Sequence, residues 1–249
     1  MRLRAIDVQN MDALRQRFTS AGTMDELHAV CRDYSEALGF QHFVYALRVP
    51  THFADARLIM VDGYPPDWVK HYFEQHHFDA DPVMAYCAQH VVPMCWSDLS
   101  LEPGSQAERM MQEAAGFGLR DGGTMPLHSP QGELGILSFA VDAAPKEARV
   151  TCQNALVQIQ MVVGYLHEAV RRVSGLVDNI GPVLTSREIE CLRWAADGKT
   201  SGEIAQLLGL SESTANFHLN NAMRKLDVVN RQHAVAKATL QGHIQPRPF

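Results

Sequence analysis

Apolar residues recur at helical spacing along most of this chain, and capping signals mark several points where helices are predicted to begin. Thr23 is followed three residues later by Glu26, and Thr185 by Glu188, which is the spacing of a capping box. Glycines and prolines mark where these periodic segments stop. The predicted helices cover about residues 11–21, 23–39, 67–77, 106–117, 146–174, 185–198, 200–209, 211–226 and 231–241, and another begins at Asp81-Pro82.

Four shorter segments are rich in aromatic and β-branched residues and are bounded by turn-forming residues, which predicts strands. A repeated strand–helix–strand order with glycine-rich turns is absent from the sequence. An antiparallel sheet with helices on both faces is therefore expected. A loop is expected from Cys95 to Pro103. The predicted strands are residues 40–49, 57–62, 122–128 and 133–141, the last two joined by a turn at residues 129–132.

Residues 175–183 contain two glycines and a proline, which is typical of a linker between domains. They divide the chain into a first domain of residues 1–174 and a second of residues 184–249. The predicted fold class is therefore α+β, with an N-terminal α-β-α sandwich around an antiparallel sheet. A C-terminal all-α helix-turn-helix domain is expected to follow it.

The C-terminal region predicts three short helices, and Gly209 makes a tight turn between the second and the third. One side of the third helix carries amides, hydroxyls and basic groups, which suit base edges and phosphates in a major groove. A solvated polar face explains this helix equally well when it is taken alone, but the capped helix and turn before it favour DNA binding. The predicted buried stripe is Ala215, Leu219, Ala222 and Leu226, and the candidate DNA-binding residues are Thr200, Ser211, Ser213, Thr214, Asn216, His218, Asn220, Arg224 and Lys225.

Charge is unevenly distributed between the two predicted domains, although the whole chain has a net charge of −6. From Leu184 onward there are 8 basic and 6 acidic residues, whereas residues 1–183 hold 14 basic and 22 acidic ones. The candidate DNA-binding part is thus the positive part, as contact with phosphates requires. Its small excess gives weak non-specific affinity, so we expect a homodimer that reads two half-sites.

The composition is that of an ordinary globular protein, with 46% hydrophobic and 20% charged residues. No apolar run approaches the roughly 18 residues of a transmembrane helix, and the N-terminus lacks the apolar core of a signal peptide. The cysteines are odd in number and lack C-x-x-C spacing, which fits a reduced, cytoplasmic setting with neither a disulfide framework nor a zinc site. They are Cys31, Cys87, Cys95, Cys152 and Cys191.

The C-terminal stretch resembles the DNA-binding domain of the LuxR-type regulators. Glu188, Leu192 and Gly198 stand where that family keeps hallmark residues, and the segments GKTSGEIA and STANFHLNNAMRKL follow its pattern. Ala215 departs from the valine that is usual in the family, which thins the core without removing a DNA contact. The resemblance implies a transcription factor that binds operator DNA and works with RNA polymerase.

In the N-terminal domain, Tyr64, Trp68, Asp81 and Ser138 are polar residues among apolar neighbours. A phenol, an indole N–H, a carboxylate and a hydroxyl around an apolar cavity suit a small ligand with amide and carbonyl groups and an apolar tail. Simpler explanations stay open for each residue. Asp81 is adequate as a helix cap, Tyr64 as a loop anchor, and Trp68 with Tyr72 as plain core.

The N-terminal region is similar to the autoinducer-binding domain of the same regulators, which implies an N-acyl-homoserine lactone as the ligand. Matching positions are Trp68, Tyr72, Asp81, Pro82, Trp96 and Gly122, and Gly123 doubles a glycine in a way expected to loosen that turn. The resemblance implies that Trp68 donates to the lactone carbonyl, Asp81 accepts the amide N–H, Tyr64 and Ser138 bind the acyl carbonyl, Thr124 and Trp96 line the cavity, and Tyr72 packs against it. Met60, Val61, Met84, Met125 and Leu137 are available to a medium or long acyl tail.

Other classes of function find less support in the sequence. A phosphorylated receiver domain needs parallel βα repeats and an acidic cluster near the N-terminus, and neither is evident. Catalysis is not expected, since a nucleophile elbow and a phosphate loop are absent. The spacing of His71, His76 and His77 does not place two of them on one helical face, so we expect neither a metal nor a cofactor beyond the small-molecule ligand. A regulator of the same fold that needs no ligand, or takes another one, is not excluded.

Overall fold

The computed structural model describes residues 8–50, 56–176 and 184–245, which form two compact units. The first unit contains most of residues 8–176, and the second contains residues 184–245. Residues 177–183 of the predicted linker lie outside the described residues. None of the helices in the described parts of the chain combines the length and apolarity needed to cross a bilayer.

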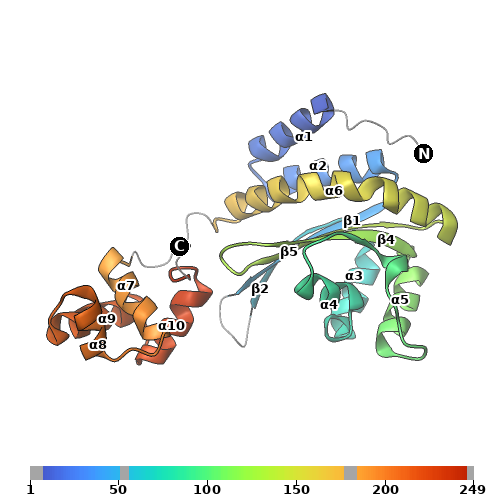
Figure 1. The fold of residues 1–249 in the computed structure, drawn as a ribbon. Coiled ribbons are helices and arrows are strands. Elements are labelled where there is room, and N and C mark those ends of the chain that lie inside the picture. The colour runs from blue at the N-terminus through green and yellow to red at the C-terminus, as the bar shows by residue number, and fades with distance from the viewer. Residues whose placement is uncertain (1–7, 51–55, 177–183, 246–249) are drawn as a thin grey trace. The chain divides into compact units, whose positions relative to one another are not determined.

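The first unit is a five-stranded sheet in the order β2-β1-β5-β4-β3, with antiparallel pairing of β1 with β5, β5 with β4, and β4 with β3. Figure 1 shows α1, α2 and α6 along one face of this sheet and α3, α4 and α5 along the other, so the predicted sandwich is confirmed. The expected loop at Cys95 is wrong at its start, because a two-residue strand is too short to show a period in sequence. The strands are β1 (His42–Pro50), β2 (Ala56–Asp62), β3 (Met94–Cys95), β4 (Asp121–His128) and β5 (Leu134–Val141).

Two helices of the first unit begin at predicted capping residues, Thr23 and Asp81. The Thr23 hydroxyl accepts the Glu26 amide at 3.2 Å, and Asp81 caps the helix that starts at Pro82. The helix predicted over residues 67–77 ends early, because His76 adopts a left-handed φ of 52° and turns the chain into a short 3-10 helix, His77–Asp79. The helices are α1 (Val8–Ser20), α2 (Met24–Leu38), α3 (Pro66–Glu74), α4 (Pro82–Gln89), α5 (Gln106–Gly116) and α6 (Pro145–Val173).

The register of the sheet separates its two faces. Ser138 lies opposite Thr124 on β4, and Thr124 lies opposite Met94 on β3, so these side chains share one face. Leu137 alternates to the other face, where its neighbour Tyr45 meets His167 of α6. Met125 pairs with Leu137 and therefore also faces α6. The suggestion that these two residues contact a tail beside Ser138 is thus wrong.

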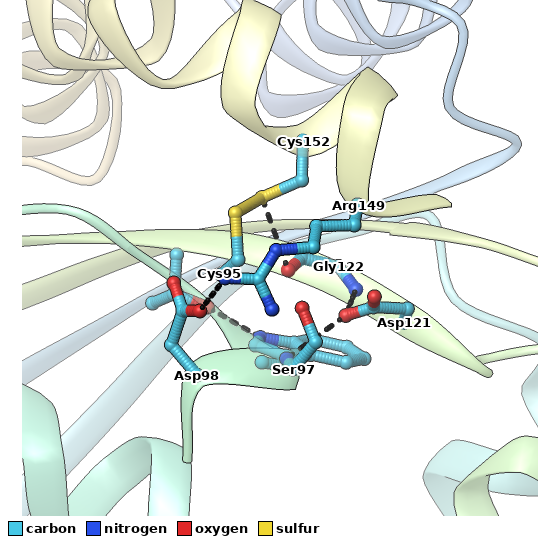
Figure 2. The surroundings of a disulfide bond; sticks show 9 residues. Cys95, Ser97, Asp98, Asp121, Gly122, Arg149 and Cys152 are labelled. Carbon is cyan, nitrogen blue, oxygen red and sulfur yellow. Dashed lines mark hydrogen bonds and ion pairs between the residues drawn. A yellow bond between two sulfur atoms is a disulfide. The ribbon is translucent and has the colours of Figure 1, made fainter. Parts of the chain in front are cut away.

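A disulfide joins Cys95 of β3 to Cys152 of α6, with their Cα atoms 6.1 Å apart (Figure 2). The expectation of five reduced cysteines is wrong for this pair, because the sheet brings together two residues that are 57 positions apart. An exposed ion pair of 2.8 Å between Arg149 and Asp98 ties the same two segments together. The edge of the sheet is thereby attached to α6. The remaining cysteines, Cys31, Cys87 and Cys191, are free and buried.

The disulfide predicts how many thiols react in denatured protein that has not been exposed to a reducing agent. Three are expected, one from each free cysteine, and five are expected after reduction. Titration with a chromogenic thiol reagent in denaturant measures both numbers. The variant Cys152→Ser is the control, since it should leave four reactive thiols. Five thiols in the parent before reduction would contradict the pairing.

The second unit is a small helical domain in which the predicted capping box at Thr185 is confirmed, and Thr200 forms another with Glu203. Gly209, with a φ of 66°, makes the turn between the second and third helices. The predicted stripe on the third helix is buried, and Cys191 and Leu192 of the first helix belong to the same core. The helices are α7 (Ser186–Ala196), α8 (Ser201–Leu208), α9 (Glu212–Lys225) and α10 (Arg231–Leu240).

Candidate functional site

A chain of polar groups crosses the face of the sheet that carries α3, α4 and α5. The Trp96 indole donates to the Thr124 hydroxyl at 2.7 Å, and that hydroxyl lies 2.9 Å from the hydroxyl of Ser138. Ser138 is in turn a hydrogen-bond partner of the Tyr64 hydroxyl. Thr124 and Ser138 are both buried. Four residues predicted from separate segments therefore form one connected polar row.

The two glycines of β4 make room for this arrangement. A Cβ on Gly122 would lie 2.3 Å from the Phe139 carbonyl oxygen and 3.0 Å from the Trp96 ring. A Cβ on Gly123 would lie 2.9 Å from the Cys152 sulfur on the other face of the sheet. The glycines therefore lie within a packed strand, and the expectation that Gly123 loosens a turn is wrong.

Asp81 is held by three hydrogen bonds. One carboxylate oxygen accepts the Val83 and Met84 amides at 2.8 and 3.2 Å, and the other accepts the Tyr72 hydroxyl at 2.8 Å. Burial raises the pKa of Asp81 above its usual range, and these hydrogen bonds oppose that rise. The oxygen bound to Tyr72 keeps a second lone pair, so it has the capacity to accept one more donor.

Tyr64 is hydrogen-bonded to Ser138 of the polar row and also interacts with the charge of Asp81. Burial raises the pKa of Tyr64, and the negative charge of Asp81 raises it further, which places the two groups near each other. Trp68 is buried beside them, with its ring 5.9 Å from that of Tyr72 in an edge-on contact. Apolar side chains surround this set, as the predicted cavity would need. The cluster around it includes Val83, Met94, Leu119, Leu134, Ile136 and Ala140, with Met84 packed against it.

The polar side of α9 is exposed as the sequence predicts, with Asn216, Asn220 and Arg224 in a row and His218 partly buried. Two of these residues each take part in one side-chain hydrogen bond within the domain. Asn216 accepts the Ser201 hydroxyl at 2.7 Å, and Arg224 donates to Asn221 at 3.2 Å.

Several other candidate DNA-binding residues have structural roles in the second unit. Lys225 donates to the buried carboxylate of Glu188 at 2.8 Å, so its ammonium holds α9 against α7. The Thr200 and Ser211 hydroxyls cap the next helices. Ser211 also meets the hydroxyls of Ser213 and Thr214 at 2.8 and 2.7 Å.

One exposed residue on α9 escaped the sequence reasoning. Phe217 is 60% exposed beside Asn216, although an aromatic ring on a helix surface is usually buried. The sequence does indicate its exposure, because Phe217 does not fall on the buried stripe from Ala215 to Leu226. An apolar side chain on a groove-reading helix suits the methyl group of thymine.

Comparison with known proteins identifies both parts of the chain. The autoinducer binding domain family matches residues 23–170, and the bacterial regulatory proteins of the luxR family match residues 182–238. The transcriptional activator AhyR of Aeromonas hydrophila is 34% identical over 239 residues, which are 93% of this chain and 90% of that protein. The quorum sensing-dependent regulator RpaR of Rhodopseudomonas palustris is 36% identical over 209 residues, which are 83% and 84%.

A solved structure has the same fold across both units. It is SdiA in complex with octanoyl-rac-glycerol, which is 27% identical, with a TM-score of 0.78 over 96% of this chain and 97% of that one. The similarity therefore covers the polar row of the first unit and the helices of the second. The chain belongs to the luxR family of bacterial regulatory proteins and is a quorum-sensing transcriptional regulator rather than an enzyme, with an autoinducer-binding domain followed by a helix-turn-helix DNA-binding domain.

Proposed function

We propose that the first domain binds an N-acyl-homoserine lactone and that the bound lactone controls how the second domain engages its operator. The observation that carries this proposal is the convergence of Trp68, Asp81, Tyr64 and Ser138 around one apolar cluster. An acyl-homoserine lactone offers two carbonyl acceptors, one amide donor and a tail, so the polar groups of the ligand and of the protein are complementary.

Each polar group of the ligand has a partner in this arrangement. Asp81 accepts the amide N–H, and the buried, charge-assisted hydrogen bond contributes about 1.5–3 kcal/mol. Trp68 donates to the lactone carbonyl, and Tyr64 with Ser138 holds the acyl carbonyl. Thr124, Trp96 and Tyr72 support these residues through the hydrogen bonds described above. The tail then runs along Met60 and Met84, whereas Val61 follows Met60 on β2 and points to the opposite face of the sheet.

A second ligand class is supported by one specific observation. The SdiA structure contains octanoyl-rac-glycerol, an acyl chain on a hydroxylated head group. Hydroxyls of such a head group also suit Asp81, Tyr64 and Ser138, since each accepts a hydrogen bond. A regulator of this fold that needs no ligand is the remaining alternative.

Mass spectrometry of an organic extract from the purified full chain distinguishes these cases. Expression in a host that makes acyl-homoserine lactones should yield one lactone per chain. An acylglycerol alone would support the second ligand class, and an empty extract would support the ligand-independent alternative. Either of these two results would overturn the lactone assignment.

We also propose that the protein acts as a cytoplasmic homodimer. Four apolar residues repeat along one side of α6, at spacings of seven, four and four, and each is between 43 and 53% exposed. An apolar stripe of this kind suits a second copy of the same helix. If sedimentation of the ligand-bound chain gave the mass of a single chain, the dimer would be contradicted. The stripe consists of Val150, Val157, Met161 and Tyr165.

Operator binding is assigned to the exposed side of α9, and RNA polymerase is the further partner at the promoter. Asn220→Ala and Arg224→Ala are each expected to weaken operator binding by about 1 kcal/mol or more, roughly fivefold, because each removes groups that face the groove. Fluorescence anisotropy with operator DNA at fixed salt measures this change. Lys237→Ala on α10 is the charge-matched control. Parental affinity in both α9 variants would show that another surface reads the operator.

A further inference from the structure

Two histidines and a glutamate meet on the outer side of the aromatic cluster in the first unit. The Nε2 atoms of His71 on α3 and His77 after it lie 2.8 and 3.0 Å from the same oxygen of Glu113 on α5. All three potential ligand atoms lie within 4.8 Å of one another. The expectation from spacing that these histidines point apart is wrong, because the left-handed turn at His76 brings His77 back against α3.

The surrounding rings fix how the two imidazoles point. His77 stacks on Trp68, with ring centroids 5.7 Å apart and an interplanar angle of 20°. His71 lies 5.6 Å from the ring of Phe117. The His77 side chain is 8% exposed, whereas those of His71 and Glu113 are 32% and 45% exposed. The cluster therefore has one buried wall and one side open to solvent, through which an ion has access.

The charge at the cluster also suits a cation. Glu113 offers a half-exposed carboxylate oxygen, and each histidine offers one ring nitrogen beside it. A glutamate is ordinarily a carboxylate at neutral pH, so the cluster supplies one negative charge to a cation. Two neutral imidazoles and one carboxylate are the ligand set that zinc and its neighbours in the first transition row accept.

We propose that His71, His77 and Glu113 bind one divalent transition-metal ion, with zinc as the best match. Bonds of about 2.0–2.2 Å in a tetrahedral site place ligand atoms about 3.3 Å apart. The two nitrogen–oxygen distances need to open by only a few tenths of an ångström, which side-chain rotation supplies. Water takes the fourth position. Magnesium and calcium fit poorly, since they need mainly oxygen ligands.

The hydrogen bonding of the metal ligands limits the affinity of the site for the ion. Nδ1 of His77 is buried and has no hydrogen-bond partner among the residues that the structure describes. A partner at this atom normally orients a metal-bound histidine, and its loss costs about 10–100-fold in affinity. The ion is therefore bound reversibly. It joins α3 to α5 behind Trp68 and stiffens that wall of the domain, whether or not the domain takes a lactone.

Metal binding is tested on the untagged full chain by titration with Co²⁺, followed by displacement with Zn²⁺ and elemental analysis. His71→Gln and Glu113→Gln change partly exposed side chains, so both variants should fold. Their matched controls are His76→Asn, which keeps a residue that tolerates the left-handed turn, and Glu74→Gln, and both alter exposed residues nearby. We expect one ion per chain in the parent and in both controls, and binding weaker by about tenfold or more in the two cluster variants.

Thermal unfolding gives a second readout of the same site. Zinc should raise the Tm of the parent and of His76→Asn, and should leave the Tm of His71→Gln unchanged. Equal affinity in parent and cluster variants, or no stoichiometric ion in the parent, would overturn the site. A thiolate-to-cobalt absorption band would also overturn it, because the ion would then lie on a cysteine.

Discussion

Replacing Asp81 with asparagine is expected to raise the lactone concentration for half-maximal response by about 100-fold, because a charge-assisted hydrogen bond is lost. Asparagine retains an oxygen for the Val83 and Met84 amides, and it is a good N-cap, so α4 should stay folded. Its amide group, however, offers N–H donors where Tyr72 and the ligand amide both need an acceptor. The folded domain would thus lose recognition without losing its helix.

A reporter dose–response curve and direct binding of the lactone to purified protein measure this effect. Asp79→Asn is the matched control, since it removes an exposed carboxylate two residues away. Circular dichroism should match the parent in both variants, and operator binding should match the parent in Asp79→Asn. A parental dose–response curve for folded Asp81→Asn would refute the role given to this carboxylate.

Replacing Glu188 with glutamine is expected to lower the free energy of unfolding of the second unit by about 1.5–3 kcal/mol. One oxygen of this buried carboxylate accepts both the Thr185 amide at 2.7 Å and the Lys225 ammonium at 2.8 Å. The variant leaves that ammonium without its anion in the interface between α7 and α9. Glu203→Gln is the control, because Glu203 caps Thr200 in the same way but is exposed.

Lowering the pH should reduce the difference in the free energy of unfolding between the parent and Glu188→Gln. Burial alone raises the pKa of Glu188, but Lys225 and Thr185 outweigh it and hold the pKa below the usual 4.5. A carboxyl with a lowered pKa in the folded state stabilises the fold above its unfolded value, and this stability is lost as pH falls through the folded value. Amide hydrogen exchange in α7 and α9 should therefore show the parent losing its advantage over Glu188→Gln below about pH 4.5. If the difference in protection between the parent and Glu188→Gln stayed constant below this pH, the ion pair between Glu188 and Lys225 would be contradicted.

Much of the fold follows from local signals in the chain. Capping pairs such as Thr185 with Glu188, and the stripe from Ala215 to Leu226, specify helices because their partners lie within one or two turns. The helix-turn-helix and its family could be read for the same reason. Trp68 and Asp81 could be predicted as ligand-binding residues through the resemblance, because the short motifs around them are recognisable in the sequence.

Contacts between distant segments lay beyond any local signal. The pairing of Cys95 with Cys152, the use of Lys225 as a partner for Glu188, and the convergence of His71 and His77 on Glu113 each depend on how separate elements pack. Sheet register likewise turned Met125 toward α6, because side chains alternate between faces. Periodicity and capping are properties of neighbouring residues, so the sequence by itself determines them. Disulfides, ion pairs and ligand clusters form only when packing brings remote residues together, so only the tertiary structure decides them.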